Sequence, residues 1–583
     1  MRRILLLCFL LMSALPALAT APGWQTDPER AFARARETQR PLFLYLEARW
    51  CHWCHVMQQE TLSDPAVRAE LSRHYVVLKV DHDANPLLAN RYRDYGWPAL
   101  IFFDADGREI VKRAGHIAAA DFLRLLQAIV RDPSPEALAG IAPVVPAATP
   151  VLAATARAQL LRRHEQSYDA RLGGLATAQK FIDRDSVEYA LEHAAEPRER
   201  RKASQTLDAA QALIDPVWGG AYQYSTGGNW QQPHYEKIMR SQAGVLRSYA
   251  LAWARLQRPS DLRAAQAMRD YLLGFLRDPG GGFYVSQDAD LVQGRKAGDY
   301  FRLDDAGRRA LGLPRIDRSL YADASGQAAE ALALLYETSG DAAALEAALA
   351  AGRWLQRERL GKDGSYRHGA RDDGLRFLND TLAPARAFLA LYRVTADRIW
   401  LTRATAAADA IRLRFSAQPA GFLTASAAGS PVAPLPDLSE NIAAARLFNL
   451  LQHYSGRPQD AAAAALAMRY LAADAIIDQA FEEAGILLAA DELAQPPLHL
   501  VVVGAKQDSN ARALFDAALR APGSYKRLEW WDPAEGPLPH ADVQYPRFAR
   551  AAAYVCSAGR CSTPSFEAAR YREAIARLQA GGR

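Results

Sequence analysis

The sequence lacks a strong excess of charge of either sign. Its 583 residues hold 70 Lys and Arg against 65 Asp and Glu, a formal net charge of +5. The densest basic run, from Arg198 to Lys202, is interrupted by Glu199, and we interpret it as a solvated helix face. No tract of Lys and Arg is interleaved with aromatic residues, as nucleic-acid binding requires. We therefore expect no nucleic-acid partner.

Long hydrophobic runs are also scarce. Beyond the N-terminus, no stretch of the sequence reaches the roughly 18 uninterrupted apolar residues of a membrane span. The N-terminus, MRRILLLCFLLMSALPALAT, has two arginines, an apolar run and then Ala17-Leu18-Ala19, which is typical of a secretory signal. The sequence thus predicts a signal peptide over residues 1–19, a periplasmic or secreted protein, and no membrane span after cleavage. An uncleaved anchor is the alternative.

Cysteine is rare, with five residues in the chain. Cys8 leaves with the predicted signal, so the mature protein keeps four cysteines, which predict the disulfides Cys51–Cys54 and Cys556–Cys561 in an oxidising compartment. We interpret the second pair as structural, with a second redox pair as the alternative. A four-cysteine zinc site and metal capture by the first pair with His52 and His55 are further alternatives. We expect no metal and no cofactor.

Residues 23–131 alternate between strand-like and helix-like patterns. The runs PLFLYLEA (41–48) and VVLKVDHD (76–83) are typical of buried strands, and residues 97–110 predict a hairpin with its turn at Asp106-Gly107. A helical pattern, AADFLRLLQAIVRD, closes the segment. This order predicts an α/β domain, followed by a Pro/Ala-rich linker over residues 132–150.

Residues 151–495 consist of long Ala/Leu/Arg helices separated by short glycine turns. The turns are Leu172-Gly173-Gly174-Leu175, Trp218-Gly219-Gly220, Gly281-Gly282-Phe283-Tyr284, Gly364-Ser365-Tyr366, Ala420-Gly421-Phe422 and Ala484-Gly485-Ile486. A helix pair plus a glycine turn, repeated six times, predicts an (α/α)6 barrel. The alternative is an irregular helical array, since helices often end at glycine.

The last segment, residues 496–583, begins with LHLVVVGAKQDSNARALFDAAL, which predicts a buried strand followed by a helix. Gly504 follows the strand without a G-x-G-x-x-G motif, which is weak evidence for a nucleotide site. The sequence as a whole therefore predicts a multidomain protein of α/β plus all-α class, with a small C-terminal α/β segment.

The motif RWCHWCHVM, residues 49–57, fits both the C-x-x-C-H signature of c-type haem attachment and the C-x-x-C motif of thioredoxins. It directly follows a buried strand and opens a helix, so the positive end of the helix dipole faces Cys51 and stabilises its thiolate. We predict that Cys51 is an exposed attacking thiol of lowered pKa, aided by His52 when that residue is protonated. Cys54 is then the resolving thiol.

Trp97-Pro98 is the second mark of a thioredoxin-like domain, because it lies just before the next strand. A cis Pro98 would present a backbone edge to a substrate strand. Together the two marks favour thiol chemistry over haem attachment, and we expect a colourless protein.

A second candidate site lies near three of the glycine turns in the helical region. Aromatic faces stack on sugar rings, and carboxylates or a histidine can transfer protons in glycoside hydrolysis or epimerisation. His368 is a further candidate base. The alternatives are carbohydrate chemistry, sugar binding, and a scaffold for the redox domain. The candidates are His234, Glu236, Asp288, Asp290, Trp218 and Trp230, with Tyr222, Tyr224, Tyr284 and Tyr366 nearby.

The pattern CHWCHVM…VVLKVD…GWP resembles the spermatogenesis-associated protein 20 family, also called YyaL-like thioredoxin-domain proteins. The resemblance covers about residues 25–575. It implies a thioredoxin-like domain joined to an (α/α)6 domain similar to N-acylglucosamine 2-epimerases. The family segments carry over His234, Glu236, Lys237, Asp288, Asp290 and Asn441.

Tyr45 marks a departure from ordinary thioredoxins, whose buried acid falls at this position and helps to deprotonate the resolving thiol. Glu47 and Glu60 are the nearest replacements in the sequence. The prediction is an exported thiol–disulfide oxidoreductase fused to a six-hairpin glycan-processing-like domain, acting on protein thiols or a redox partner protein, with a carbohydrate as a further ligand. The alternative is a carbohydrate-active or carbohydrate-binding protein whose thioredoxin-like domain is structural or regulatory.

Overall fold

The computed structural model describes residues 23–93, 96–136, 144–372, 374–426, 432–479, 483–557 and 559–581. The predicted signal peptide and part of the predicted linker lie outside the described residues. The chain divides into two compact units. The first comprises Met1–Glu47, Trp53–Val80 and Tyr95–Leu138, and the second comprises Ala48–His52, Asp81–Asp94 and Ala139–Arg583.

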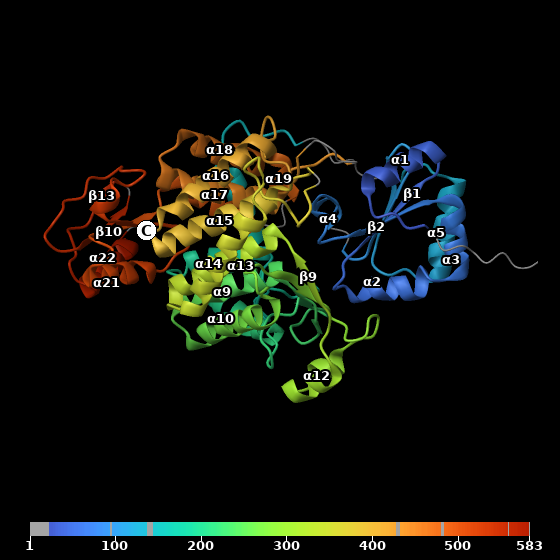
Figure 1. Cartoon of the computed structure of the whole chain (residues 1–583), viewed down its shortest axis with the longest axis horizontal. Helices are drawn as coiled ribbons and strands as arrows, with labels where there is room; N and C mark the ends of the chain where they lie inside the picture. Colours follow the sequence, from blue (N-terminus) through green and yellow to red (C-terminus); the bar gives the residue numbers. More distant parts are fainter. Residues whose placement is uncertain are drawn as a thin grey trace, which may run out of the picture. The chain divides into compact units, whose positions relative to one another are not determined.

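The first unit is built on a four-stranded sheet of order β2-β1-β3-β4 (Figure 1). Strand β3 pairs antiparallel with both β1 and β4, and Leu44 faces Ile101 across the β1–β3 pair. The strands alternate apolar side chains into a core that contains Phe43 and Phe102, whose rings stack at 4.8 Å. The predicted strands and the predicted hairpin are thus confirmed. The strands are β1 (Leu42–Glu47), β2 (Val76–Asp81), β3 (Ala99–Phe103) and β4 (Glu109–Ala114).

Helices cover the sheet because their apolar residues recur at helical spacing. In α5 (Ala119–Arg131), Phe122, Leu126 and Ile129 are buried on one face. Helix α3 packs against α5. The sequence did not predict α1, which begins where Asp27 caps the backbone N–H of Arg30. The further helices of residues 28–92 are α1 (Pro28–Thr38), α2 (His52–Val56) continuing as the π-helix η1 (Met57–Thr61), α3 (Pro65–His74) and α4 (Pro86–Tyr92).

Within the described residues of the second unit, six inner helices form a closed ring in which each contacts the next and the last contacts the first. Outer helices pack against them (Figure 1). This arrangement confirms the predicted (α/α)6 barrel. The inner helices are α7 (Arg184–Glu192), α9 (Met239–Leu256), α13 (Ala322–Ser339), α15 (Leu378–Thr395), α17 (Leu438–Ser455) and α20 (Glu483–Ala494). The outer helices are α6 (Ala154–Gln166), α8 (Pro197–Ala210), α10 (Pro259–Tyr271), α14 (Ala342–Glu358), α16 (Arg398–Phe415) and α18 (Pro458–Leu471).

Short helices and strands connect the helices of the ring. Strands β7, β8 and β9 form one small sheet, and β5 pairs with β6. The connecting elements are η3 (Gln211–Leu213), β5 (Tyr224–Ser225), β6 (Pro233–His234), β7 (Lys237–Ile238), η4 (Leu272–Leu276), β8 (Tyr284–Gln287), α11 (Gly298–Phe301), α12 (Asp305–Leu311), β9 (Ile316–Leu320) and α19 (Asp474–Gln479).

Five of the six predicted glycine turns share one structure. Each turn joins an outer helix to the next inner helix and is closed by an antiparallel bridge. Gly219 has a φ of 69°, and a Cβ added there would lie 2.2 Å from the carbonyl oxygen of Ala267, so only glycine fits. The bridges are Tyr168–Leu175, Ile214–Ala221, Arg277–Phe283, Leu360–Tyr366 and Ser416–Phe422.

Polar side chains near the starts of the inner helices hold these turns. The Asn441 side chain accepts from the N–H of Phe422 at 2.7 Å and donates to its carbonyl at 3.0 Å. Gln242 makes the equivalent pair of bonds to Ala221. Ser325 and Thr381 accept from the N–H groups of Phe283 and Tyr366. The structure thus gives Asn441 a place in the framework of the barrel.

The sixth predicted turn is wrong, because Gly485 lies inside α20. A Cβ at this position would lie 2.5 Å from Oδ2 of Asp185 and 2.8 Å from Cδ1 of Ile442. The glycine therefore allows close packing of inner helices rather than ending a helix. A sequence pattern alone does not separate these two uses of glycine.

The C-terminal residues form a second four-stranded sheet, of order β11-β10-β12-β13. Strand β10 runs parallel to β11 and antiparallel to β12. The predicted strand and helix at the start of this segment are confirmed. The elements are β10 (Leu498–Val503), α21 (Ser509–Leu519), β11 (Lys526–Trp531), η5 (Pro533–Glu535), β12 (Ala552–Ser557), β13 (Arg560–Cys561) and α22 (Ala568–Gly581).

This C-terminal sheet shares its core with the helical ring. Leu500 and Leu528 belong to the same apolar cluster as the inner helices. Buried Glu337 of α13 binds Lys526 at 2.8 Å and Arg393 at 2.6 Å. A buried ion network of this kind costs desolvation energy, so its good geometry fixes how the sheet docks on the ring.

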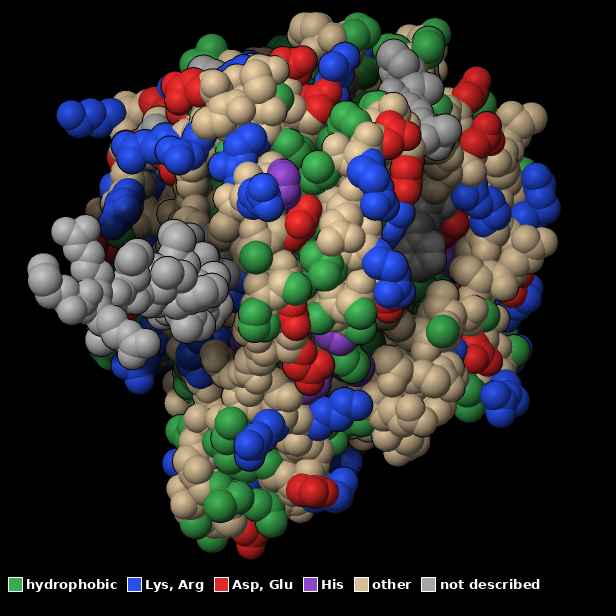
Figure 2. Space-filling model, turned by 90° about the vertical axis from the view of Figure 1, so that its right-hand side faces the viewer, with side chains coloured by type: hydrophobic (Ala, Val, Ile, Leu, Met, Phe, Trp, Pro, Cys, Tyr) green, Lys and Arg blue, Asp and Glu red, His purple; other side chains and the backbone are tan. Residues whose placement is uncertain are grey.

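On the face drawn in Figure 2, Lys and Arg side chains are interspersed with Asp and Glu side chains. This mixed surface agrees with the near balance of charge in the sequence. Among the described helices, none combines the length and the apolar character that a bilayer crossing requires.

Candidate active site

Cys51 and Cys54 lie between the end of β1 and the body of α2, and both are disulfide-bonded. The N–H of Cys51 donates to the carbonyl of Ala48 at 3.1 Å, so the chain turns sharply before the helix begins at His52. Cys51 is 4% exposed and Cys54 0%. The predicted exposure of Cys51 is therefore wrong for the oxidised state, in which the residue is buried and its sulfur is bonded.

Tyr45 replaces the buried acid of ordinary thioredoxins and has a different role. Its hydroxyl donates to the carbonyl oxygen of Cys54 at 2.8 Å. Burial, with the charge of Glu47 adding to it, raises the pKa of Tyr45 well above its ordinary value. The phenol is therefore neutral and positions the backbone of the motif, and it cannot act as a base near neutral pH.

The two acidic residues that the sequence offered as replacements differ in their surroundings. Glu47 pairs with Lys79 at 2.8 Å, with little of either side chain exposed. Glu60 has a side chain that is 68% exposed, 3.7 Å from Nε2 of His116. Glu60 is thus a solvated charge, and Glu47 is part of an ion pair.

Trp53, inside the Cys motif, is 38% exposed, and its ring stacks on that of His116 at 6.1 Å. His116 lies just after β4 and also approaches the hydroxyl of Thr61 at 3.4 Å. Sequence reasoning missed His116, since no motif or spacing marks it. An exposed aromatic ring with a polar edge beside it is suited to binding a peptide surface.

The Trp97–Pro98 peptide bond is cis. Pro98 is buried directly before β3, the strand that pairs with β1, and its carbonyl accepts from the N–H of Gly115 at 2.8 Å. The structure therefore has a cis proline at the position where the sequence analysis considered one.

His52 and Asp290, which the sequence assigned to separate candidate sites, lie together in the second unit. Nδ1 of His52 is 2.8 Å from Oδ1 of Asp290, and both side chains are buried. A carboxylate can only accept, so this contact places a proton on Nδ1. The N–H of Asp290 donates to Asp288 at 3.1 Å, and that of Gly294 donates to Asp290 at 2.8 Å.

His234, at the end of β6, and Glu236, directly before β7, lie near this carboxylate pair. Nδ1 of His234 is 3.9 Å from Oε2 of Glu236. Burial lowers the pKa of His234, and the His52 charge adds to this. Burial raises the pKa of Glu236 to about 7, with Asp290 contributing in the same direction. The pairing of β7 with β8 thus brings the segment of His234 and Glu236 next to the segment of Asp288 and Asp290.

Lys237 has a different environment from these neighbours. Its ammonium group binds Asp215 at 2.8 Å, and Arg308 binds the same carboxylate at 2.7 Å. Burial lowers the pKa of Lys237 to about 8. The Lys237 ammonium also donates to the carbonyl of Gly219 at 2.8 Å, so it holds a glycine turn.

Trp218, Trp230 and His234 do not share neighbours as one sugar platform would require. Trp218 is buried against Phe275 and donates to Asp305 at 2.7 Å. Trp230 is buried and donates to the carbonyl of Leu172 at 2.9 Å. The His234 ring stacks on Tyr224 at 4.4 Å. Sugar stacking needs an open aromatic face, and burial removes it from both tryptophans.

Asp323, His368 and Asp380 form a cluster whose ligand atoms all lie within 4.8 Å of one another. Both ring nitrogens of His368 are already engaged, Nδ1 with Asp380 at 3.0 Å and Nε2 with the carbonyl of Asp83 at 2.7 Å. Burial alone lowers the pKa of His368, but Asp380 and Asp323 raise it to about 9. The imidazole is thus a cation at neutral pH, which suits neither a metal ligand nor the second epimerisation base.

The fold and the motif define the class of this protein. It combines a thioredoxin-like domain that carries a Cys51–Cys54 pair with an (α/α)6 barrel. Residues 15–130 match the family Thioredox_DsbH, described as "Protein of unknown function, DUF255". The chain carries this domain and is homologous to spermatogenesis-associated protein 20.

The human spermatogenesis-associated protein 20 is 27% identical over 304 residues, 46% of this chain and 39% of the relative. The thiol:disulfide interchange protein DsbD 1 of Pseudomonas aeruginosa is 37% identical over 126 residues, 19% of this chain and 21% of the relative. A crystal structure of D-mannose isomerase aligns with 58% of this chain and 96% of its own, at 11% identity and a TM-score of 0.44. The matches span about two fifths of the length of the first curated relatives.

Proposed function

We propose that this protein is a thiol–disulfide oxidoreductase that uses Cys51 and Cys54. The observation that carries the proposal is the disulfide-bonded pair at the junction of β1 and α2, in a domain whose β3 is preceded by cis Pro98. The similarity of this region to a thiol:disulfide interchange protein supports the proposal. Protein thiols and disulfides are the proposed substrates.

In the reducing direction, the Cys51 thiolate attacks one sulfur of a substrate disulfide. The S–S bond of the substrate breaks, a mixed disulfide with Cys51 forms, and the leaving sulfur takes a proton. The Cys54 thiolate then attacks the sulfur of Cys51 and releases the second substrate thiol. The substrate gains two electrons and two protons, and the protein returns to its disulfide form. In the oxidising direction the same steps run in reverse.

Two features around the motif support particular roles. The bond from Tyr45 to the carbonyl of Cys54 anchors the backbone of the motif and so contributes to the stability of the domain rather than to the rate of exchange. The partly exposed Trp53, stacked on His116, provides an apolar and polar surface for a substrate peptide beside the sulfurs.

The test is disulfide exchange with a protein substrate, followed by acid quenching and mass spectrometry. We expect the wild-type chain to catalyse exchange, Cys51→Ser to be inactive, and Cys54→Ser to accumulate mixed disulfides through Cys51. Ser63→Ala, which removes an exposed hydroxyl bonded to Gln59, is the matched control and should behave as wild type. Full activity of Cys51→Ser would overturn the proposal, and so would a Soret band that survives denaturation.

We further propose that the protein is exported and acts in the periplasm or outside the cell. The support is the arginine pair, apolar run and Ala17-Leu18-Ala19 at the N-terminus, together with a second pair of cysteines joined as a disulfide. Cell fractionation with mass measurement of the N-terminal peptide tests this. We expect the chain in the exported fraction to begin at Thr20, and cytosolic retention of the full chain would contradict it.

A further inference from the structure

The disulfide Cys556–Cys561 joins two neighbouring antiparallel strands of the C-terminal sheet, where the two residues face each other in register. Its two ends differ in their access to solvent. Cys561, on the edge strand β13, is exposed, whereas Cys556, on β12, is only 5% exposed. The exposed Cys561 is therefore the end that a thiolate from solution can approach, and Cys556 is placed to be the leaving sulfur.

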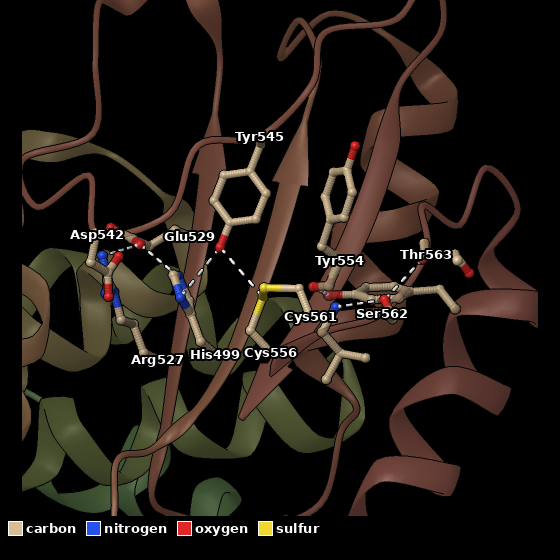
Figure 3. The surroundings of a disulfide bond; sticks show 12 residues. His499, Arg527, Glu529, Asp542, Tyr545, Tyr554, Cys556, Cys561, Ser562 and Thr563 are labelled. Atoms are coloured by element: carbon tan, nitrogen blue, oxygen red, sulfur yellow. Dashed lines mark hydrogen bonds and ion pairs between the residues drawn. A yellow bond between two sulfur atoms is a disulfide. The ribbon is translucent and has the colours of Figure 1, made fainter. Parts of the chain in front are cut away.

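A chain of buried polar side chains approaches the sulfur of Cys556 (Figure 3). The hydroxyl of Tyr545 lies 3.7 Å from Sγ of Cys556 and 3.5 Å from Nδ1 of His499. Nε2 of His499 lies 2.9 Å from Oε2 of Glu529. Two side chains, Tyr545 and His499, thus connect the sulfur to the buried carboxylate of Glu529.

Ion pairs hold the end of this row of side chains that lies farthest from the sulfur. Arg527 binds Oε2 of Glu529 at 2.8 Å and Asp542 at 2.8 Å. The Glu529 carboxylate accepts from Nε2 of His499, and Nδ1 of the same ring faces the Tyr545 hydroxyl. Burial raises the pKa of Tyr545, so the phenol stays protonated and its hydroxyl can turn to donate a hydrogen bond to Sγ of Cys556 when that sulfur leaves.

This arrangement exceeds what a structural crosslink needs. A closed disulfide requires no proton donor, and burying His499, Glu529 and Arg527 costs desolvation energy. A sulfur that leaves as a thiolate in a buried place does require a donor, because an isolated buried anion is strongly disfavoured. The Tyr545 hydroxyl is a polar group in contact with that sulfur.

We propose that Cys556–Cys561 is a second redox-active disulfide, which a dithiol protein reduces by attack at Cys561. A thiolate of the dithiol bonds to Sγ of Cys561, and the Cys556–Cys561 bond breaks. The leaving sulfur of Cys556 accepts a hydrogen bond from the Tyr545 hydroxyl and takes up, through solvent, the proton that the attacking thiol released. The second thiol of the partner attacks the mixed disulfide, releases the Cys561 thiol and becomes part of the oxidised partner. Two electrons and two protons pass from the partner to this site.

This proposal is independent of the chemistry proposed for Cys51 and Cys54. Peptides that contain Cys556 and Cys561 are separable by mass from the peptide that contains the other pair. Failure of either site is therefore visible without removing the other. His499 is a positioning residue in this scheme, since it acts on the sulfur through Tyr545.

The experiment uses the full folded chain with reduced thioredoxin as the dithiol probe, followed by acid quenching, differential alkylation and peptide mass spectrometry. We expect Cys556–Cys561 to open in the native protein, at least tenfold faster than in Tyr545→Phe. A thioredoxin that lacks its resolving cysteine should be captured on Cys561. In glutathione buffers, the equilibrium constant for reduction should fall at least fivefold in Tyr545→Phe and in His499→Gln.

Tyr554→Phe is the matched control. Its ring lies 5.0 Å from that of Tyr545, but its hydroxyl points away from the sulfurs, 3.4 Å from the carbonyl of Pro546 (Figure 3). We expect wild-type rates and equilibrium constants for this variant. His499→Gln keeps the test available should Tyr545→Phe fail to fold. A disulfide that opens only on unfolding, capture at Cys556, or equal values in all variants would overturn the proposal.

Discussion

The two disulfides of this protein each have a buried tyrosine beside them, and the two tyrosines differ in what they contact. Tyr45 donates to the carbonyl oxygen of Cys54, a backbone atom. Tyr545 places its hydroxyl against the sulfur of Cys556, with His499 on its other side. The first disulfide lies at the start of a helix, whose dipole is available to stabilise a thiolate. The second joins two strands, whose small dipoles give little help, so side chains must stabilise the leaving sulfur.

The largest expected effect is the order in which the reduced thiols react. At the first pair the helix start favours Cys51, and at the second pair exposure favours Cys561. With limiting alkylating reagent, we expect Cys51 to be labelled on the order of 100-fold faster than Cys54, and Cys561 faster than Cys556 by a similar factor. Peptide mass spectrometry over a pH series measures both ratios. Equal labelling of the two cysteines within a pair would contradict the predicted order of reaction for that pair.

The second-largest expected effect is a dependence of the unfolding free energy on pH, which arises from neither disulfide. His368 has a pKa raised to about 9 from an ordinary value of 6.5. Its contribution to folding is therefore complete below pH 6.5 and is lost as the pH rises to about 9, roughly 3 kcal/mol in all. Denaturant unfolding of the oxidised chain from pH 6 to pH 9 should show this loss, and His368→Gln should flatten it. A slope that is unchanged in the variant would assign the effect to other groups.

The smallest expected effect separates the two tyrosines. Tyr45→Phe removes one buried hydrogen bond and should cost about 1 kcal/mol of unfolding free energy. Because the hydroxyl contacts a backbone carbonyl, the rate of exchange at Cys51 should stay within about twofold of wild type. Stopped-flow reduction and denaturant unfolding give the two values. A large loss of rate in Tyr45→Phe would mean that both disulfides use a tyrosine in their chemistry.

Much of the fold follows from local patterns in the sequence. The strands of residues 41–48 and 76–83 are continuous apolar runs, and the Asp106-Gly107 turn fixes the hairpin between β3 and β4. Five of the glycine turns repeat because each has a glycine with positive φ and a closing antiparallel bridge. The prediction failed at Gly485, because the sequence does not distinguish a glycine that allows close packing of helices from a glycine that forms a turn.

The candidate sites were predictable to a smaller extent. The Cys motif and Pro98 are marked by spacing, and Glu236, Asp288 and Asp290 by their place near glycine turns. The burial of Trp218 and Trp230 was not predictable, because the sequence does not show whether an aromatic residue in a loop is exposed or buried.

The sequence by itself determined the elements, the repeat and the position of the reactive pair, because these depend on neighbouring residues and on helical or strand periodicity. Only the tertiary structure decided that His116 stacks on Trp53, and that Tyr545, His499 and Glu529 line up behind Cys556. These side chains are separated by tens of residues and meet because sheet pairing and helix packing bring their elements together. Contact between distant residues depends on the whole fold, and no local pattern in the chain records it.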